Sequence, residues 1–134
     1  MKQIVIVRGT PGSGKSTLAK EIQAKHVEAD MFFMKNGNYC YDRRKIQDAH
    51  LWCQAVTKYY LNQGEDVVVS NTFTMISEMQ PYFDMAKAYN SSIKVMECKG
   101  DFSNEHDVPA EVILKMKRRW EALPEGIDLY KVEK

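Results

Sequence analysis

An unbroken match to the pattern GxxxxGK[ST] runs through residues 9–16, which read Gly9-Thr10-Pro11-Gly12-Ser13-Gly14-Lys15-Ser16. The preceding segment, residues 2–8, is a short run rich in β-branched residues that stops at Gly9, as a buried strand does. The following segment, residues 14–25, places Leu18 and Ile22 on one helical face. A strand, a glycine-rich turn and a helix in this order predict a loop that binds phosphate groups.

The residue types of this loop explain the predicted chemistry. Glycines adopt backbone conformations closed to other residues, so that amide N–H groups turn inward around phosphate oxygens. The start of a helix adds its positive dipole end. Lys15 would contact the β- and γ-phosphates as a catalytic charge, and the Ser16 hydroxyl would join the water shell of Mg²⁺. We therefore expect a nucleoside triphosphate, ATP or another, to bind Gly9, Thr10, Pro11, Gly12, Ser13, Gly14, Lys15, Ser16 and Thr17.

The rest of the chain alternates apolar, strand-like runs with helical patterns. Strands are expected at residues 26–33, 65–70 and 92–97. Helices are expected at residues 42–62, 75–89 and 110–123, the first capped by Asp42 and closed by Gly64, the second with Pro81 in its first turn. A polar segment at residues 99–108 is typical of a loop or lid, and residues 127–134 fit no pattern clearly. The alternation predicts an α/β fold with a mostly parallel sheet of four to five strands.

Composition limits the class of protein further. The 134 residues are 44% hydrophobic, which fits a single domain over residues 1–134. The 19 Lys and Arg residues nearly balance 18 Asp and Glu residues, a formal net charge of +1 that argues against tight, non-specific binding to a nucleic acid polymer. The three cysteines are scattered, and no apolar run approaches a signal peptide or a membrane span. We expect a cytoplasmic protein without membrane contact.

Beyond the phosphate-binding loop, the chain resembles the polynucleotide-kinase-like P-loop kinases along nearly its whole length. The resemblance rests on the order and spacing of several blocks. They are residues 8–20 (RGTPGSGKSTLAK), 28–33 (EADMFF), 48–54 (DAHLWCQ), 67–74 (VVVSNTFT), 78–82 (EMQPY) and 104–109 (NEHDVP), followed by Met116 and Arg119-Trp120-Glu121. The family likeness implies a three-layer α/β/α fold of the P-loop NTPase, kinase type.

The resemblance also implies an activity and further site residues. The family transfers the γ-phosphate of an NTP, with Mg²⁺, to a hydroxyl of a nucleic acid end or a nucleotide-like acceptor. Asp30 occupies the place of the carboxylate that activates the acceptor hydroxyl. Arg119 is expected to reach the nucleotide. The residues expected on the acceptor side are Phe33, Arg43, Arg44, Asn71 and Thr72, with base stacking as a possible role of the nearby aromatic rings.

Three positions depart from the family pattern. Phe33 stands where polynucleotide kinases of the phage type carry an arginine, and Ser70 stands where the third strand normally ends in an acidic residue for the Mg²⁺ water shell. The lid segment 99–108 holds no arginine, so that Lys99, Arg118 or Arg119 would have to supply its charge. The lid residues expected to matter are Lys99, Asn104 and His106.

These departures keep two other functions open. A nucleoside, nucleotide or other small-molecule kinase is favoured by the near-neutral charge and by Phe33. A nucleotide-binding switch or inhibitor protein without robust transfer is favoured by the missing lid arginines and by Ser70.

Overall fold

The computed structural model describes residues 2–98, 108–123 and 128–132 of the chain, and its main element is a five-stranded sheet. The strands are ordered β2-β5-β1-β6-β7, and every neighbouring pair is parallel. The bounds are β1 (Gln3–Arg8), β2 (Lys25–Val27), β5 (Val67–Asn71), β6 (Ser92–Cys98) and β7 (Asp128–Val132). The predicted α/β fold with a mostly parallel sheet is confirmed, and part of the segment without a clear pattern forms β7.

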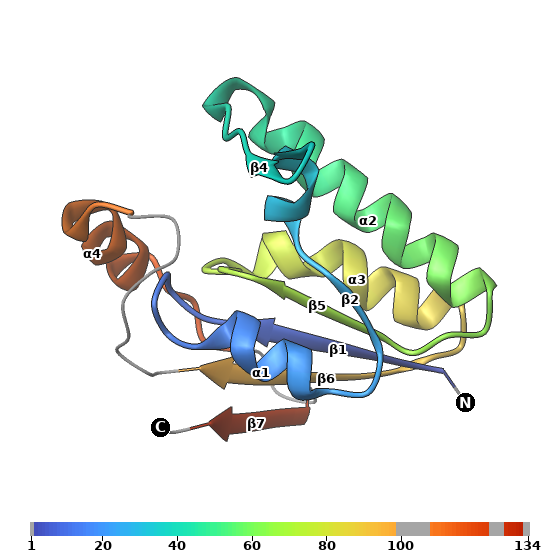
Figure 1. Cartoon of the computed structure of the whole chain (residues 1–134). Coiled ribbons are helices and arrows are strands. Elements are labelled where there is room, and N and C mark those ends of the chain that lie inside the picture. Colours follow the sequence, from blue (N-terminus) through green and yellow to red (C-terminus); the bar gives the residue numbers. More distant parts are fainter. Residues whose placement is uncertain (1, 99–107, 124–127, 133–134) are drawn as a thin grey trace.

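Helices cover both faces of this sheet (Figure 1). On one face lies α1 (Lys15–Glu21), and on the other lie α2 (Ile46–Asn62) and α3 (Ile76–Ala88). A fourth helix, α4 (Ala110–Arg118), lies beyond the carboxyl ends of the strands. Within the part of the chain that the structure describes, no helix has the length and apolar character needed to cross a membrane.

The strands carry consecutive apolar residues because both of their faces are buried. Val5 and Val7 pack with Ala19 of α1, whereas Ile4 and Ile6 belong to the larger core formed with α2 and α3. All four strand residues are at most 2% exposed. The central position of β1, between β5 and β6, therefore gives the loop that follows it a rigid base.

The carboxyl ends of the central strands lie level with one another. Arg8, the last residue of β1, is in register with Asn71 of β5 and with Glu97 of β6. In open α/β sheets, ligands bind outside this edge. The loop after β1 and the residues after β2 and β5 are thereby brought to one side of the molecule.

The second strand is much shorter than predicted. Only residues 25–27 pair with β5, and the 3₁₀ helix η1 (Ala29–Phe33) takes the place of the expected strand end. The backbone N–H of Ala29 donates to Oδ1 of Asn71 at 2.9 Å instead of continuing the ladder. A hairpin of β3 (Met34–Lys35) and β4 (Asn38–Tyr39) follows η1.

Several helix boundaries also differ from the prediction. Asp42 caps the short 3₁₀ helix η2 (Arg43–Lys45) that leads into α2, through a bond from the Arg44 N–H to its side chain. Gly64 follows the end of α2 with φ 79°, as predicted. Pro81 lies in the second turn of α3 and not in the first, because α3 begins at Ile76. Helix α1 ends at residue 21 and α4 at residue 118, both earlier than the periodicity indicated.

Candidate active site

The loop between β1 and α1 has the backbone of a phosphate-binding turn. Gly12 (φ 84°) and Gly14 (φ 91°) both adopt left-handed conformations, which only glycine takes at little cost. The Ser13 N–H donates to the Thr10 carbonyl at 3.1 Å and closes the turn between them. Alternation of left- and right-handed backbone turns successive amides toward one centre, so this loop fits an anion.

Gly9 sits where a side chain would crowd its neighbours. A β-carbon added there would collide with the Ser13 hydroxyl and would lie 3.1 Å from the carbonyl oxygen of Cys98. The Ser13 Oγ is itself buried and has no hydrogen-bond partner among the described residues. The base of the loop is thus packed tightly against β6. Lys15 and Ser16 begin α1 and are half-buried, while Thr17 is exposed.

Glu28, which directly follows β2, is held by three neighbours from three different elements. Its Oε1 accepts a hydrogen bond from Ser16 Oγ at 2.7 Å and one from Ser70 Oγ at 2.6 Å. The Nε2 atom of His26 lies 3.0 Å from the same Oε1 and 3.0 Å from Ser70 Oγ. A carboxylate is thereby joined to the hydroxyl that the sequence assigns to the metal shell.

The charge of Glu28 is set by two opposing effects. Burial raises the pKa of this carboxyl group, because a low-dielectric environment disfavours the charged form. Hydrogen bonds from His26, Ser70 and Ser16 outweigh burial and lower the pKa of Glu28 to about 2. Glu28 is therefore a carboxylate at neutral pH.

Asp30 lies in η1, two residues beyond Glu28, at the edge of the sheet where the phosphate-binding loop also lies. The Tyr39 hydroxyl, from the β3–β4 hairpin, donates to Asp30 Oδ1 at 3.2 Å. Burial, followed by the charge of Asp30, raises the pKa of Tyr39, so the phenol remains a donor. The bond from Ala29 N–H to Asn71 fixes the start of the turn. The backbone and one aromatic side chain together orient Asp30.

An aromatic cluster borders Asp30 and opens into a pocket of about 770 Å³. Phe33 is buried at its base, with ring centroids 5.1 Å from Tyr41 and 6.2 Å from Tyr39, and the Tyr39 and Tyr41 rings are stacked. The residues that line the pocket are Phe32, Phe33, Met34, Lys35, Cys40, Tyr41, Asp42, Arg44 and Lys45. Aromatic faces beside basic side chains suit a planar, anionic ligand.

The structure places the other predicted acceptor residues unequally. Arg44 lines this pocket and is paired with Asp42 at 3.1 Å, and both Arg43 and Arg44 are exposed. Asn71 is buried and bonds Ala29 and the Cys53 sulfur, so its amide positions the backbone under Asp30. Thr72 is half-exposed at the end of β5. Their contact with an acceptor stays a prediction.

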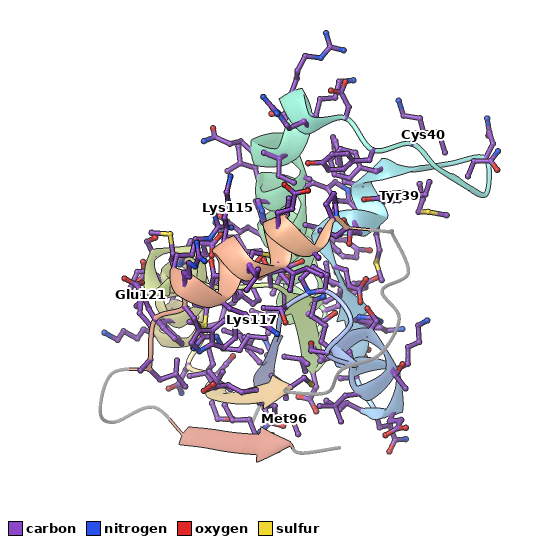
Figure 2. The ribbon with its side chains drawn as sticks, turned by 90° about the vertical axis from the view of Figure 1, so that its left-hand side faces the viewer. Tyr39, Cys40, Met96, Lys115, Lys117 and Glu121 are labelled. Carbon is purple, nitrogen blue, oxygen red and sulfur yellow. The ribbon has the colours of Figure 1, made fainter. Side chains whose placement is uncertain are left out.

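Helix α4 ends in a basic turn, and Arg119, which the sequence associates with the nucleotide, directly follows it. Figure 2 looks onto the carboxyl ends of the strands, with α4 lying across them. Lys117 lies on the side of α4 that faces the strands, and Lys115 lies on the opposite side. Arg119 is exposed, and its Nε donates to Thr74 Oγ1 at 3.0 Å, in the loop after β5. The predicted lid residues Lys99, Asn104 and His106 lie outside the described residues.

The donor set at Ser16 fits a magnesium ion bound together with a nucleotide. Mg²⁺ prefers oxygen ligands, keeps several waters and is commonly held by one or two carboxylates plus substrate phosphates. Ser16, Ser70 and Glu28 supply two hydroxyls and one carboxylate. No group of three or more His, Cys, Asp or Glu side chains able to hold a metal occurs among residues 2–98, 108–123 and 128–132. The residues present therefore match an ion shared with phosphates and not a closed protein cage.

The loop follows β1 and Asp30 follows β2, as the sequence predicts, whereas the contacts of Glu28, His26 and Tyr39 were not predicted. One signal was available for Glu28, because it is an acidic residue only two positions before Asp30. The acidic residue was expected instead at the end of the strand that contains Ser70. The contact between His26 and Ser70 spans 44 residues and has no local signature.

The parallel sheet, the glycine-rich turn at the end of its central strand and the lysine that opens the next helix define a P-loop protein. More specifically, the chain belongs to the AAA domain family AAA_33, which matches residues 4–103. This result confirms the predicted likeness to P-loop kinases.

Two curated relatives share close to a third of the aligned residues. The uncharacterized protein PM0531 of Pasteurella multocida is 31% identical over 134 residues, an alignment that covers 87% of this chain and 75% of that protein. NEDD4-binding protein 2 of Homo sapiens is 30% identical over 100 residues, covering 70% of this chain. The present chain spans 6% of the length of that human protein.

Solved structures share the fold at low sequence identity. A sugar kinase from Janibacter superposes with a TM-score of 0.72 at 14% identity, covering 99% of this chain and 86% of the kinase. The Pnkp1/Rnl/Hen1 complex contains a chain that superposes with a TM-score of 0.57 at 22% identity, covering 93% of this chain and 42% of that chain. The three-layer fold is therefore that of P-loop kinases.

Proposed function

We propose that this protein is a phosphotransferase that moves the γ-phosphoryl group of ATP, or another NTP, to a hydroxyl of a nucleic acid end or a nucleotide-like acceptor. The observation that carries the proposal is the placement of Asp30. This carboxylate is oriented by Tyr39 at the sheet edge that also bears the phosphate-binding loop.

Each residue of the site has a distinct part in such a reaction. The backbone N–H groups of residues 9–14, except at Pro11, and the Lys15 ammonium hold the phosphates and offset the charge that spreads over the γ-phosphoryl oxygens. Asp30 accepts the proton of the acceptor hydroxyl as its oxygen attacks phosphorus. The new O–P bond forms while the bond from the β–γ bridging oxygen to the γ-phosphorus breaks, and NDP leaves with that oxygen. A bound Mg²⁺ would supply Lewis-acid stabilisation of the phosphate oxygens, held through Ser16 and its neighbours.

One observation favours a small-molecule acceptor as the second candidate. Phe33 is 2% exposed and Arg44 is paired with Asp42, so the pocket has no buried arginine directed at a substrate phosphate among the described residues. A nucleoside or another compact acceptor requires no such contact. The two classes differ in salt dependence, because binding of a polymer weakens steeply as salt rises.

Radiolabelled γ-phosphate transfer tests the proposal. The acceptors are 5′-hydroxyl DNA, 5′-hydroxyl RNA, nucleosides and sugars, each at low and high salt. Asp30→Asn should lower the transfer rate about 10²–10⁴-fold while the affinity for nucleotide is unchanged. Asp84→Asn, at an exposed position of α3, is the matched control and should keep the wild-type rate. Transfer by Asp30→Asn at the wild-type rate contradicts the assignment of Asp30.

A further inference from the structure

The end of β5 lacks a negative charge. Its last residues are Ser70 and Asn71, both neutral and both buried. Asn71 is committed to Ala29 and to the sulfur of Cys53. Ser70 instead directs its hydroxyl to Glu28 at 2.6 Å, across the sheet to the neighbouring strand.

Glu28 has the geometry of a group that supports a metal-bound hydroxyl. A serine that coordinates Mg²⁺ through its oxygen keeps its proton and must donate it to an acceptor. Ser16 Oγ donates to Glu28 Oε1 at 2.7 Å, which leaves the lone pairs of Ser16 directed elsewhere. Such a partner orients the ligand and raises its basicity.

The surroundings of Glu28 hold its carboxylate in one position. His26 and Ser70 both contact Oε1, and they also contact each other at 3.0 Å. The side chains of His26 and Glu28 are each 15% exposed, so the network is largely shielded from solvent. The contacts of His26, Ser70 and Ser16 with Glu28 all use one oxygen of the carboxylate, Oε1. If the pair of Glu28 with His26 were only structural, Glu28 would not need to contact the Ser16 hydroxyl of the phosphate-binding loop as well.

We propose that Glu28 provides the carboxylate of the Mg²⁺–nucleotide site in this protein, so that the acidic group lies after β2 instead of at the end of β5. Glu28 acts through Ser16 and Ser70, and His26 positions it. The inference rests on the proposed function only in requiring that the P-loop binds a nucleotide with Mg²⁺. It does not depend on the identity of the acceptor or on transfer.

Nucleotide binding without an acceptor provides the test. The dissociation constant of AMPPNP is measured by titration calorimetry at saturating Mg²⁺ and in EDTA, and the ratio of the two values reports the coupling between metal and nucleotide. Glu28→Gln keeps the size of the side chain and removes its charge. We expect this variant to reduce the ratio roughly 10–100-fold, the usual effect of losing an outer-shell partner, with little change in EDTA. Glu65→Gln, at an exposed position, is the control and should keep the wild-type ratio.

Relocation of the charge gives a second, independent test. The double variant Glu28→Ser with Ser70→Asp returns the carboxylate to β5, and it should recover most of the coupling that Glu28→Ser alone loses. Mn²⁺ bound per AMPPNP complex, counted by electron paramagnetic resonance, should follow the same order. Unfolding by urea shows whether each variant is folded. Glu28→Asp keeps the charge and should retain the coupling, and if Glu28→Gln does not fold, the comparison of Glu28→Ser with the relocation variant decides.

The outcomes separate this inference from the proposed function. An unchanged ratio in Glu28→Gln, or an equal loss of affinity with Mg²⁺ and in EDTA, overturns the role of Glu28. A folded relocation variant with no recovered coupling also overturns it. If Mg²⁺-coupled nucleotide binding depends on Glu28 but no acceptor is phosphorylated, the inference stands and the proposed transfer activity falls.

Discussion

The guanidinium carbon of Arg8 lies 3.8 Å from the centroid of the Trp120 indole ring. Arg8 is the last residue of β1, directly before the phosphate-binding loop, and Trp120 follows α4. The same guanidinium donates from Nε to the Phe73 carbonyl and from Nη2 to the Glu121 carbonyl, each at 2.9 Å. The Arg8 side chain is fully buried. The segment that follows α4 is therefore held by Arg8 against the start of the phosphate-binding loop.

Weakening this contact should destabilise the protein. A desolvated pair of a cation and an aromatic ring contributes up to about 2 kcal/mol. We expect Trp120→Leu and Arg8→Lys each to lower the free energy of unfolding by about 1–3 kcal/mol in urea denaturation. Because the two residues touch, the double variant should lose less than the sum of the single losses, by about 1 kcal/mol. Strict additivity would show that the contact contributes nothing.

Removal of the Tyr39 hydroxyl should affect transfer and not nucleotide binding. Tyr39→Phe keeps the aromatic cluster but deletes the donor to Asp30, and a hydrogen bond to a charged group is worth about 1.5–3 kcal/mol. We expect kcat to fall roughly tenfold, with an unchanged dissociation constant for AMPPNP. Tyr41→Phe, on the ring stacked against Tyr39, is the control for a general disturbance of the pocket. Equal effects of the two substitutions would assign Tyr39 to packing alone.

Gly9 should tolerate no side chain if the loop is to bind phosphates. The β-carbon of Gly9→Ala would displace the Ser13 hydroxyl and would lie 3.1 Å from both the Ser13 β-carbon and the Cys98 carbonyl oxygen, so the base of the loop must give by a small amount. We expect the affinity for ATP to fall by roughly tenfold or more, which corresponds to about 1.4 kcal/mol. Gly37→Ala is a useful comparison, because Gly37 has φ 80° with no neighbouring atom within 4 Å. That variant should lose stability through backbone strain, by about 1 kcal/mol, and keep the affinity for ATP.

Alkaline pH should destabilise the protein through Tyr82. Burial, followed by the nearby Cys53 thiol, raises the pKa of Tyr82 above its ordinary value of 10.0. A raised pKa in the folded state means that the contribution to stability is complete below pH 10 and is lost as pH rises further, because the unfolded chain releases the proton first. Tyr82→Phe should therefore flatten the decline in the free energy of unfolding above pH 10. Tyr59→Phe, at a 60% exposed position, should leave the decline as it is.

Sequence patterns predicted the parts of the fold that depend on neighbouring residues. The strand before Gly9, the phosphate-binding turn and the long helix ending before Gly64 all have local signals, and all three are observed. The resemblance placed Asp30 after the second strand, where the structure has it. The end of β2 at residue 27 was not predictable in the same way, because it depends on Asn71, whose side-chain oxygen accepts the hydrogen bond of the Ala29 N–H.

The same limitation applies to the site. Ser70 stands at the end of its strand where an acidic residue was expected, so that strand by itself lacks the negative charge. The compensating carboxylate lies 42 residues earlier in the chain and reaches Ser70 only once β2 and β5 pair. The residues of β7 showed no strand pattern, and they pair with β6 over Asp128–Val132 through backbone contacts. The contact between Glu28 and Ser70 and the strand β7 were not predicted, because both depend on pairing between distant segments of the chain and not on local residue preferences.

The phosphoryl donor and the acceptor of the proposed reaction would bind beside different strands of the sheet, one central and one at its border. The phosphate-binding loop follows β1, which has paired neighbours on both sides, whereas Asp30, the residue proposed to activate the acceptor, follows β2, a border strand with three paired residues. Substitutions or insertions within residues 31–45 would thus alter the recognition of an acceptor while the donor half keeps its scaffold. With this arrangement, proteins that share the same phosphate-binding loop could acquire different acceptors through changes in residues 31–45.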